Sequence, residues 1–186
     1  VPSLTFLATA NAARLSGAEV VFADVDADTA LMEPAQLTKA LQQAGAAAKA
    51  VFPVHYGGQC ADPAALQSIA SAQGLMVIED ACHSLGAGYG ESRTPVGACS
   101  RSDMTVFSFH PVKAIAMGEG GMVTTNDPAL HERLCRMRNH GMVKVADRFQ
   151  IPDLGLDGDG TPNPWYYEMP ELGLNYRTSD LNCALG

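Results

Sequence analysis

The chain has 186 residues, 47% of them hydrophobic, so it can bury a core of ordinary domain size. Its 20 acidic and 12 basic residues give a net charge of -8, which excludes a broad basic surface for nucleic acid or acidic membranes. It has no apolar run of the roughly 18 residues that span a membrane and no signal-peptide pattern. The five cysteines form no CxxC pair, so we expect reduced thiols, no metal site and a soluble cytoplasmic protein.

Short apolar segments alternate with longer helical patterns, which is typical of a parallel sheet with crossover helices. The expected strands cover residues 19–26, 50–55, 75–81, 104–109 and 121–125, and the expected helices cover 32–45, 62–74 and 127–141. Asp62 and Asp127 each precede a proline, a pattern typical of a helix N-cap followed by its first residue. Gly74 and Gly141 are suited to helix ends.

The region from Val145 to Glu171 has a different composition. Its sequence "IPDLGLDGDGTPNPWYYEMP" is rich in Gly, Pro and Asp, so it predicts a loop-rich insert with a functional or partner-facing role. The chain opens at Val1 without an initiator methionine, and "TSDLNCALG" at its end predicts a helix that is cut short. We therefore expect residues 1–186 to be one partial domain of a longer protein.

Polar residues follow the third expected strand in "VIEDACHSLGAGYG". Ligands of parallel sheets gather beyond the carboxyl ends of the strands, where Asp80 and His83 are expected. A carboxylate there can keep a ring nitrogen protonated through a charge-assisted hydrogen bond. The alternative, that Asp80 caps a helix and His83 is an ordinary polar residue, stays open.

Lys113 lies between an apolar segment and the glycines of "GEGG", in the stretch "FSFHPVKAIAMGEGGMVTT". Glycines there allow a ligand to approach the backbone closely. An amine attacks a carbonyl only when it is deprotonated, so a Schiff-base lysine needs apolar burial or a neighbouring cation. An apolar surround is offered by Phe107, Phe109, Val112, Ile115 and Met117. The alternatives are a solvated loop lysine and, for Ser108, a hydroxyl that satisfies the backbone instead of a phosphate.

Four segments together resemble one family, the sugar aminotransferases of the DegT type. They are "PSLTFLATANAARLSGAEVVFADVD", "EDACHSLGA", "FSFHPVKAIAMGEGG" and "PWYYEMPELGLNYRTSDLNCALG", and they span nearly the whole chain in order. The resemblance implies the large domain of a fold-type-I aminotransferase, a mostly parallel central sheet with helices on both faces. It also implies pyridoxal 5'-phosphate as cofactor, a nucleotide-linked keto sugar as substrate and glutamate as amino donor.

The motifs "SFHPVK" and "PWYYEM" are similar to those of enzymes that aminate C4 of a UDP-linked 4-keto-6-deoxy-N-acetyl sugar on the way to pseudaminic acid. The resemblance also places the family's glycine-rich phosphate segment before Val1. It places the small C-terminal domain after Gly186. Trp165, Tyr166 and Tyr167 are then either a wall for the nucleotide sugar or a contact with a partner subunit.

The resemblance assigns roles position by position. Lys113 matches the Schiff-base lysine and general acid/base, and Asp80 matches the partner of the pyridinium nitrogen. The remaining cofactor-binding residues that it implies are His83 at the ring, Phe6 against the ring face, Ser108 at the phosphate, and Asn175 at the phosphate of the neighbouring subunit. The last of these implies a homodimer.

Three alternatives to an aminotransferase remain. Sugar dehydratases of the same family keep the cofactor but carry histidine at the position of Lys113, so the lysine disfavours them. A binding or regulatory homologue that lost the reaction is disfavoured by the presence of both Lys113 and Asp80. The third is that the isolated piece, with incomplete cofactor contacts, binds nothing.

Overall fold

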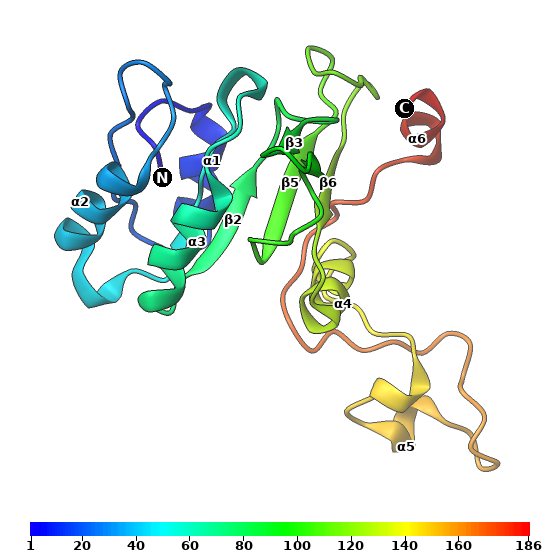
Figure 1. Cartoon of the computed structure of the whole chain (residues 1–186). Coiled ribbons are helices and arrows are strands. Elements are labelled where there is room, and N and C mark those ends of the chain that lie inside the picture. The colour runs from blue at the N-terminus through cyan, green and yellow to red at the C-terminus, as the bar shows by residue number, and fades with distance from the viewer. The chain divides into compact units, whose positions relative to one another are not determined.

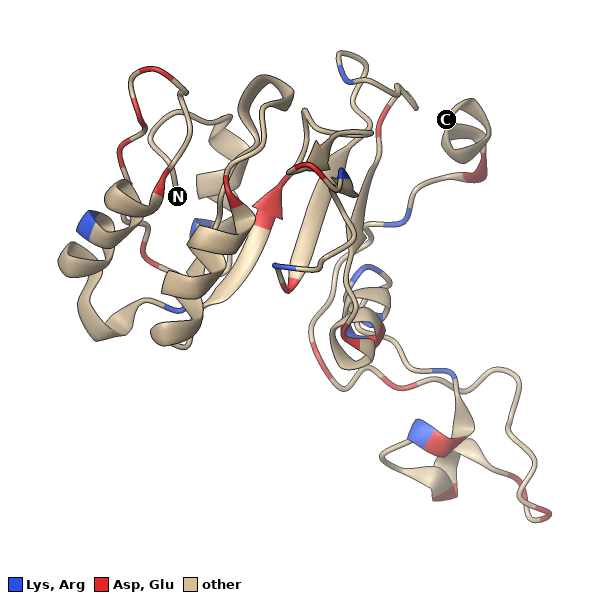
Figure 2. Ribbon diagram, in the orientation of Figure 1, with Lys and Arg blue, Asp and Glu red and all other residues tan.

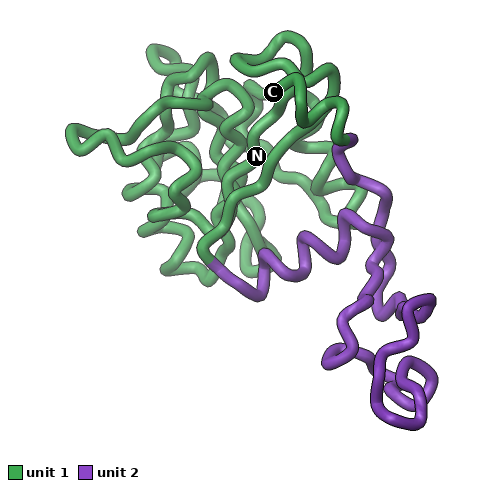
Figure 3. Tube along the Cα trace, turned by 90° about the vertical axis from the view of Figure 1, so that its right-hand side faces the viewer, with its two compact units in different colours: residues 1–126, 180–186 green, residues 127–179 purple.

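The computed structural model describes residues 1–186 and divides into two compact units. Unit 1 consists of Val1–Asn126 and Asp180–Gly186, and unit 2 consists of Asp127–Ser179 (Figure 3). No helix is both long enough and apolar enough to cross a membrane.

Unit 1 contains a four-stranded sheet with the order β1-β2-β5-β6, and Figure 1 labels β2, β5 and β6 of this sheet. The strands are β1 (Ala50–Val51), β2 (Met76–Asp80), β5 (Met104–Ser108) and β6 (Gly121–Thr124). Strands β1, β2 and β5 are parallel, and β6 is antiparallel to β5. A separate antiparallel pair is formed by β3 (Gly88–Tyr89) and β4 (Thr94–Pro95). The mostly parallel α/β fold predicted from the sequence is confirmed.

Two strand predictions need correction. Residues 19–26 form no strand, because their pairing is limited to a single parallel bridge between Ala23 and Pro2. The strand expected over 50–55 is shortened to β1. Pro53 has no backbone N–H to donate, so the ladder is interrupted there and resumes only as a bridge between Val54 and Asp80.

The helices of unit 1 are α1 (Leu7–Leu15), α2 (Pro34–Ala44), α3 (Pro63–Ala72) and α6 (Asp180–Leu185), with 3-10 turns at Gly45–Ala47 and Tyr56–Gly58. The predicted cap of α3 is confirmed, since the Asp62 carboxylate accepts hydrogen bonds from the N–H groups of Ala64 and Ala65. Helix α1 was not predicted. Its N-cap residue, Phe6, makes no side-chain cap, so the usual start signal is missing.

The main core lies between the sheet and helices α2 and α3, and α3 packs against β2. Its buried members are Ala23, Met32, Leu37, Val51, Ala61, Leu66, Ala70, Leu75 and Val77. Burial alternates along β2, with Val77 and Glu79 buried and Ile78 and Asp80 only half-buried. Since successive strand residues face opposite sides, Asp80 is directed away from the face that buries Glu79.

Unit 2 begins with helix α4 (Pro128–Met137) and continues with a 3-10 turn (Ala146–Arg148) and the short helix α5 (Pro152–Gly155). The Asp127 carboxylate caps α4 as predicted, by accepting from the N–H groups of Ala129 and Leu130. Gly141 has a φ of +70°, and a side chain there would collide with the Glu171 backbone, so only glycine fits.

Long-range contacts hold the loops of unit 2 together. Glu171 binds Arg133 and Arg136 of α4. Glu168 accepts from the backbone N–H groups of Gln150 and Ile151.

We expect Leu66→Ala to destabilise unit 1. Leu66 is fully buried in the core on α3, so its truncation leaves a cavity that costs about 2–5 kcal/mol of unfolding free energy. The measurement is urea unfolding of the full-length protein, with Ser68→Ala, at an exposed position of the same helix, as control. Equal unfolding midpoints for the two variants would contradict the assignment of this core.

Candidate functional site

Asp80 is held at the carboxyl end of β2, which is acidic in Figure 2. Its backbone N–H donates to the Pro53 carbonyl at 2.8 Å, and its carbonyl accepts from the His55 N–H at 3.0 Å. Its side chain accepts at both oxygens, Oδ1 from the Cys82 N–H at 3.2 Å and Oδ2 from the Thr9 hydroxyl at 2.6 Å. A carboxylate has about four acceptor positions, so Asp80 can still accept another donor.

Lys113 lies in the loop that joins β5 to β6, half-buried, with its N–H donating to the His110 carbonyl at 2.9 Å. The Cys82 thiol lies within electrostatic range of both Lys113 and Asp80. Burial, followed by the hydrogen bond and charge of Asp80, raises the pKa of Cys82 to about 12, and the Lys113 ammonium opposes this rise. The structure therefore brings the amine and the carboxylate into the region of one thiol, which the raised pKa keeps protonated.

The apolar surround expected for Lys113 is only partly formed. Phe107 and Met117 are buried, but Val112 is 79% exposed and Ile115 is 40% exposed. Both exposed residues lie in the loop itself, outside the strands that pack into the core.

The other predicted residues of unit 1 lie on elements next to Asp80. Ser108 is the last residue of β5, and its hydroxyl accepts from the His110 N–H at 3.3 Å. The His83 Nδ1 accepts from the Gly57 N–H at 3.3 Å, so the imidazole is tied to the Tyr56–Gly58 turn. Phe6 is 67% exposed, one turn before Thr9 on α1. The carboxyl ends of β2 and β5 adjoin in the parallel ladder, which places Ser108 and His83 at the same end of the sheet. The hydrogen bond from Thr9 to Asp80 brings α1, which Phe6 precedes, to that end as well.

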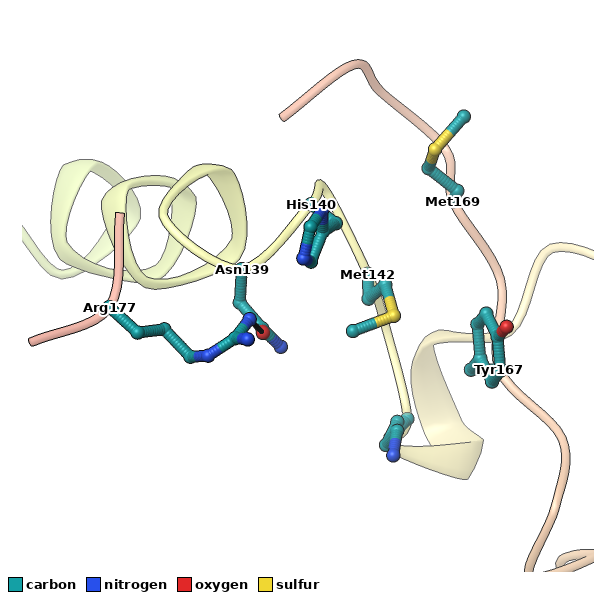
Figure 4. A pocket seen from close by; sticks show the side chains of 7 residues that line it. Asn139, His140, Met142, Tyr167, Met169 and Arg177 are labelled. Carbon is teal, nitrogen blue, oxygen red and sulfur yellow. Dashed lines mark hydrogen bonds between the residues drawn. The ribbon is translucent and has the colours of Figure 1, made fainter. Parts of the chain in front are cut away.

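Asn175 belongs to unit 2, where it is exposed and its backbone pairs with Asn139. A pocket of about 600 Å³ lies in the same unit. It is lined by Asn139, His140, Met142, Lys144, Tyr167, Met169 and Arg177. Figure 4 shows His140 and Met142 on the segment after α4, with Tyr167 and Met169 on the segment that faces it.

The pocket is cationic, because Lys144 and Arg177 line it and no carboxylate does. The Lys144 ammonium lies 5.8 Å from the centre of the Tyr167 ring, and Arg177 donates to the Asn139 Oδ1 at 2.5 Å. Tyr167 was a candidate from the sequence, but the two cations were not, because single basic residues in loops form no recognisable pattern. Of the neighbouring aromatics, Trp165 is 74% exposed, and Tyr166 packs edge-to-face on Phe149 with ring centres 4.9 Å apart.

A buried polar cluster, also missed from the sequence, lies on the other face of β2. The Thr105 hydroxyl donates to the Glu79 Oε2 at 2.7 Å, and the His55 Nε2 lies 3.9 Å from the Glu79 Oε1. The His55 Nδ1 accepts from the Ala61 N–H, so the ring hydrogen is on Nε2, which donates to the Tyr89 hydroxyl at 2.9 Å. His55, Glu79 and Thr105 are all at most 2% exposed.

The charge in this cluster is on Glu79. Burial by itself raises the pKa of Glu79, but the nearby His55 ring and the hydrogen bond from Thr105 outweigh it and hold that pKa below its usual value. Burial and the Glu79 carboxylate raise the pKa of Tyr89, which keeps the phenol protonated. The cluster is thus a satisfied buried carboxylate directly beside Asp80 in the chain.

Comparison with known proteins supports one family. The chain matches the DegT/DnrJ/EryC1/StrS aminotransferase family over residues 1–186. The spore coat polysaccharide biosynthesis protein SpsC of Bacillus subtilis is 39% identical over 184 residues. The UDP-4-amino-4,6-dideoxy-N-acetyl-beta-L-altrosamine transaminase of Campylobacter jejuni is 37% identical over 186 residues. Both alignments cover 98% of this chain and 43% of the relative, so the chain spans less than half the length of these relatives.

Solved structures agree. Helicobacter pylori PseC, described as an aminotransferase of pseudoaminic acid biosynthesis, has a TM-score of 0.80 at 30% identity, covering 98% of this chain and 42% of PseC. DesI, solved with its TDP-sugar product, has a TM-score of 0.77 at 34% identity, covering 100% of this chain and 40% of DesI. These likenesses confirm the predicted fold, that of a sugar aminotransferase large domain.

We expect Glu79→Gln to destabilise the protein at neutral pH and to lose this effect in acid. Because the pKa of Glu79 is lower in the folded state than its usual value of 4.5, its stabilisation is present above that value and is lost as the pH falls through the folded pKa. Loss of hydrogen bonds to a charged group costs about 1.5–3 kcal/mol at pH 7.

The measurement is the free energy of urea unfolding at a series of pH values from neutral to below the usual glutamate pKa of 4.5. The control is Glu91→Gln, which changes an exposed carboxylate in a turn. A pH-independent difference between Glu79→Gln and the unmodified protein would contradict a charged Glu79.

Proposed function

Because the chain belongs to the DegT/DnrJ/EryC1/StrS aminotransferase family, we propose that the full-length protein is a pyridoxal-phosphate-dependent sugar aminotransferase. It transfers an amino group from glutamate onto a nucleotide-linked 4-keto-6-deoxy sugar. The name of the Campylobacter jejuni relative supports an N-acetylated UDP-sugar of the pseudaminic acid type. The observation that supports the proposal is that Asp80 ends β2 and that the loop with Lys113 follows β5, the parallel neighbour of β2, so both residues lie at the carboxyl ends of the strands.

The residues present fit this cofactor. Asp80 is fixed by Thr9 and Cys82 but keeps free acceptor positions, which suits a protonated ring nitrogen. Lys113 supplies the primary amine that would bind the aldehyde group of the cofactor. Ser108, at the end of β5, offers a hydroxyl to a phosphate, and His83 and Phe6 are available for the ring.

Each residue then has a defined role. Pyridoxal phosphate, when bound, supplies an electron sink for the carbanion formed as the amino group is transferred. The Asp80 carboxylate keeps the proton on the ring nitrogen by accepting its hydrogen bond. The Lys113 amine would hold the cofactor through its aldehyde group and would act as the general acid/base that moves a proton at the substrate carbon.

We propose that the cationic pocket of unit 2 holds the diphosphate of the nucleotide sugar. Lys144 and Arg177 provide two positive charges without a competing carboxylate, and Tyr167 offers a flat apolar face. The pocket volume of about 600 Å³ is in the usual range of small-molecule sites.

The proposed assembly is a homodimer, in which Asn175 reaches the cofactor phosphate of the neighbouring subunit. Asn175 is exposed on unit 2, so it is available for contact with a neighbouring subunit. We propose a cytoplasmic location, which the five free thiols support.

A catalytically inactive binding homologue is the second candidate. The exposure of Val112 and Ile115 favours it, because apolar burial of Lys113 is incomplete in this chain. A sugar dehydratase is less compatible with the residues, since the family's dehydratases carry histidine in place of Lys113.

We expect borohydride treatment of the full-length protein with pyridoxal phosphate to leave a stable pyridoxyl label on Lys113. The reagent reduces the linkage between the lysine and the cofactor aldehyde, and peptide mass spectrometry locates the label. Lys113→Ala should abolish the label, whereas Lys49→Ala, at an exposed lysine, should keep it. A label on another lysine, or no label, would refute the aminotransferase assignment.

We expect Lys144→Gln and Arg177→Gln each to raise the KM for the nucleotide sugar about tenfold, because each removes one charged contact to phosphate. The kcat should change little, since neither residue touches the reacting carbon. Steady-state kinetics would measure both constants, with Lys49→Gln as control. An unchanged KM together with weaker dimerisation would show that this surface contacts the partner subunit instead.

A further inference from the structure

The hydroxyl of Thr9 makes a short contact with the site carboxylate. Its Oγ1 donates to the Asp80 Oδ2 at 2.6 Å, across 71 positions of the chain. Hydrogen bonds from a hydroxyl to a carboxylate are in this short range and are stronger than bonds between neutral groups. The contact joins α1 to the end of β2.

A second threonine orients this hydroxyl. The Oγ1 atoms of Thr5 and Thr9 are 2.8 Å apart. An ionised carboxylate only accepts, so the single hydroxyl hydrogen of Thr9 is directed to Asp80 and the Thr5 hydroxyl donates to Thr9. The result is a directed chain from Thr5 through Thr9 to Asp80.

The position of Thr9 on its helix is unusual for a polar residue. Thr9 is the single buried residue of α1, with 7% exposure. An alanine or valine there would avoid the cost of burying a hydroxyl, and valine has nearly the same shape as threonine. The hydroxyl is therefore best explained by the carboxylate that it contacts.

We propose that Thr9 is a positioning residue for Asp80. Its hydroxyl fixes the orientation of the carboxylate, so that the remaining acceptor positions of Asp80 meet the ring nitrogen of the cofactor and its proton. Thr5 supports this role by holding the Thr9 hydroxyl in its donating orientation. The inference rests on the proposed function, since the orientation of the Asp80 carboxylate matters for activity only if it binds the ring nitrogen of a cofactor.

The test compares Thr9→Val, which removes the hydroxyl but keeps the shape, with Thr9→Ser, which keeps the hydroxyl. Both are made in the full-length protein. We expect Thr9→Val to lower kcat about ten- to a hundredfold, the scale of one hydrogen bond to a charged group. We also expect it to shift the pH midpoint of the bound cofactor's absorbance. Thr9→Ser should restore both values.

Thr5→Val provides a second variant in case Thr9→Val folds poorly. It leaves the Thr9 hydroxyl in place but removes its donor, so a smaller shift of the same absorbance midpoint is expected. An unshifted midpoint in both valine variants would overturn the proposal, as would a serine variant as impaired as Thr9→Val.

A double-mutant cycle without cofactor separates this inference from the proposed function. Thr9→Val and Asp80→Asn are compared singly and together by the unfolding midpoint of the cofactor-free protein. Coupling is expected, because both changes act on the same hydrogen bond: Thr9→Val removes its donor, and Asp80→Asn removes the charge of its acceptor. Coupling without a pyridoxyl label on Lys113 would confirm the contact but refute the function and the proposed role. A label without coupling would refute the role of Thr9 alone.

Discussion

The parallel pairing of β2 with β5 is the constraint on which the site depends. The ladder joins Asp80 to Val106, and the Ala81 N–H continues it by donating to the Val106 carbonyl at 2.9 Å. Because both strands run in the same direction, the residues that follow them leave the sheet at one edge. Asp80 and the loop that carries Lys113 are brought near each other by this register, although Asp80 and Lys113 are 33 positions apart in the chain.

The same ladder places two consecutive carboxylates in different surroundings. The alternation of a strand puts Glu79 into the buried polar cluster and Asp80 on the half-buried side. Glu79 stays charged because Thr105 and the His55–Tyr89 pair surround it, while Asp80 keeps acceptor capacity for a ligand. His55 links the two, since its N–H binds the Asp80 carbonyl and its ring lies beside Glu79. One residue of register shift would exchange these two roles and leave a charged group unpaired.

The sequence was informative where structure is decided locally. The capping aspartates Asp62 and Asp127 and the apolar runs of β2 and β5 were predicted because neighbouring residues determine them. Residues 19–26 had strand composition, but pairing depends on a partner strand, and a single bridge to Pro2 is all that forms. Helix α1 lacked a side-chain cap, so the buried placement of Thr9, and with it the contact to Asp80, was not predictable from local signals.

The pocket of unit 2 could not be predicted from the sequence, because it too depends on contacts between distant residues. Its loops are fixed by carboxylates far along the chain, as in the binding of Arg133 and Arg136 by Glu171, and no periodicity marks such pairs. The pocket cations Lys144 and Arg177 are separated by 33 positions and converge only because the two segments pair through Val143 with Glu168 and Asn139 with Asn175. Those bridges bring a histidine, two cations and Tyr167 around one hollow. Residues 145–171 therefore supply one wall of this pocket, through Tyr167 and Met169, and the two pocket cations come from the chain before and after this stretch.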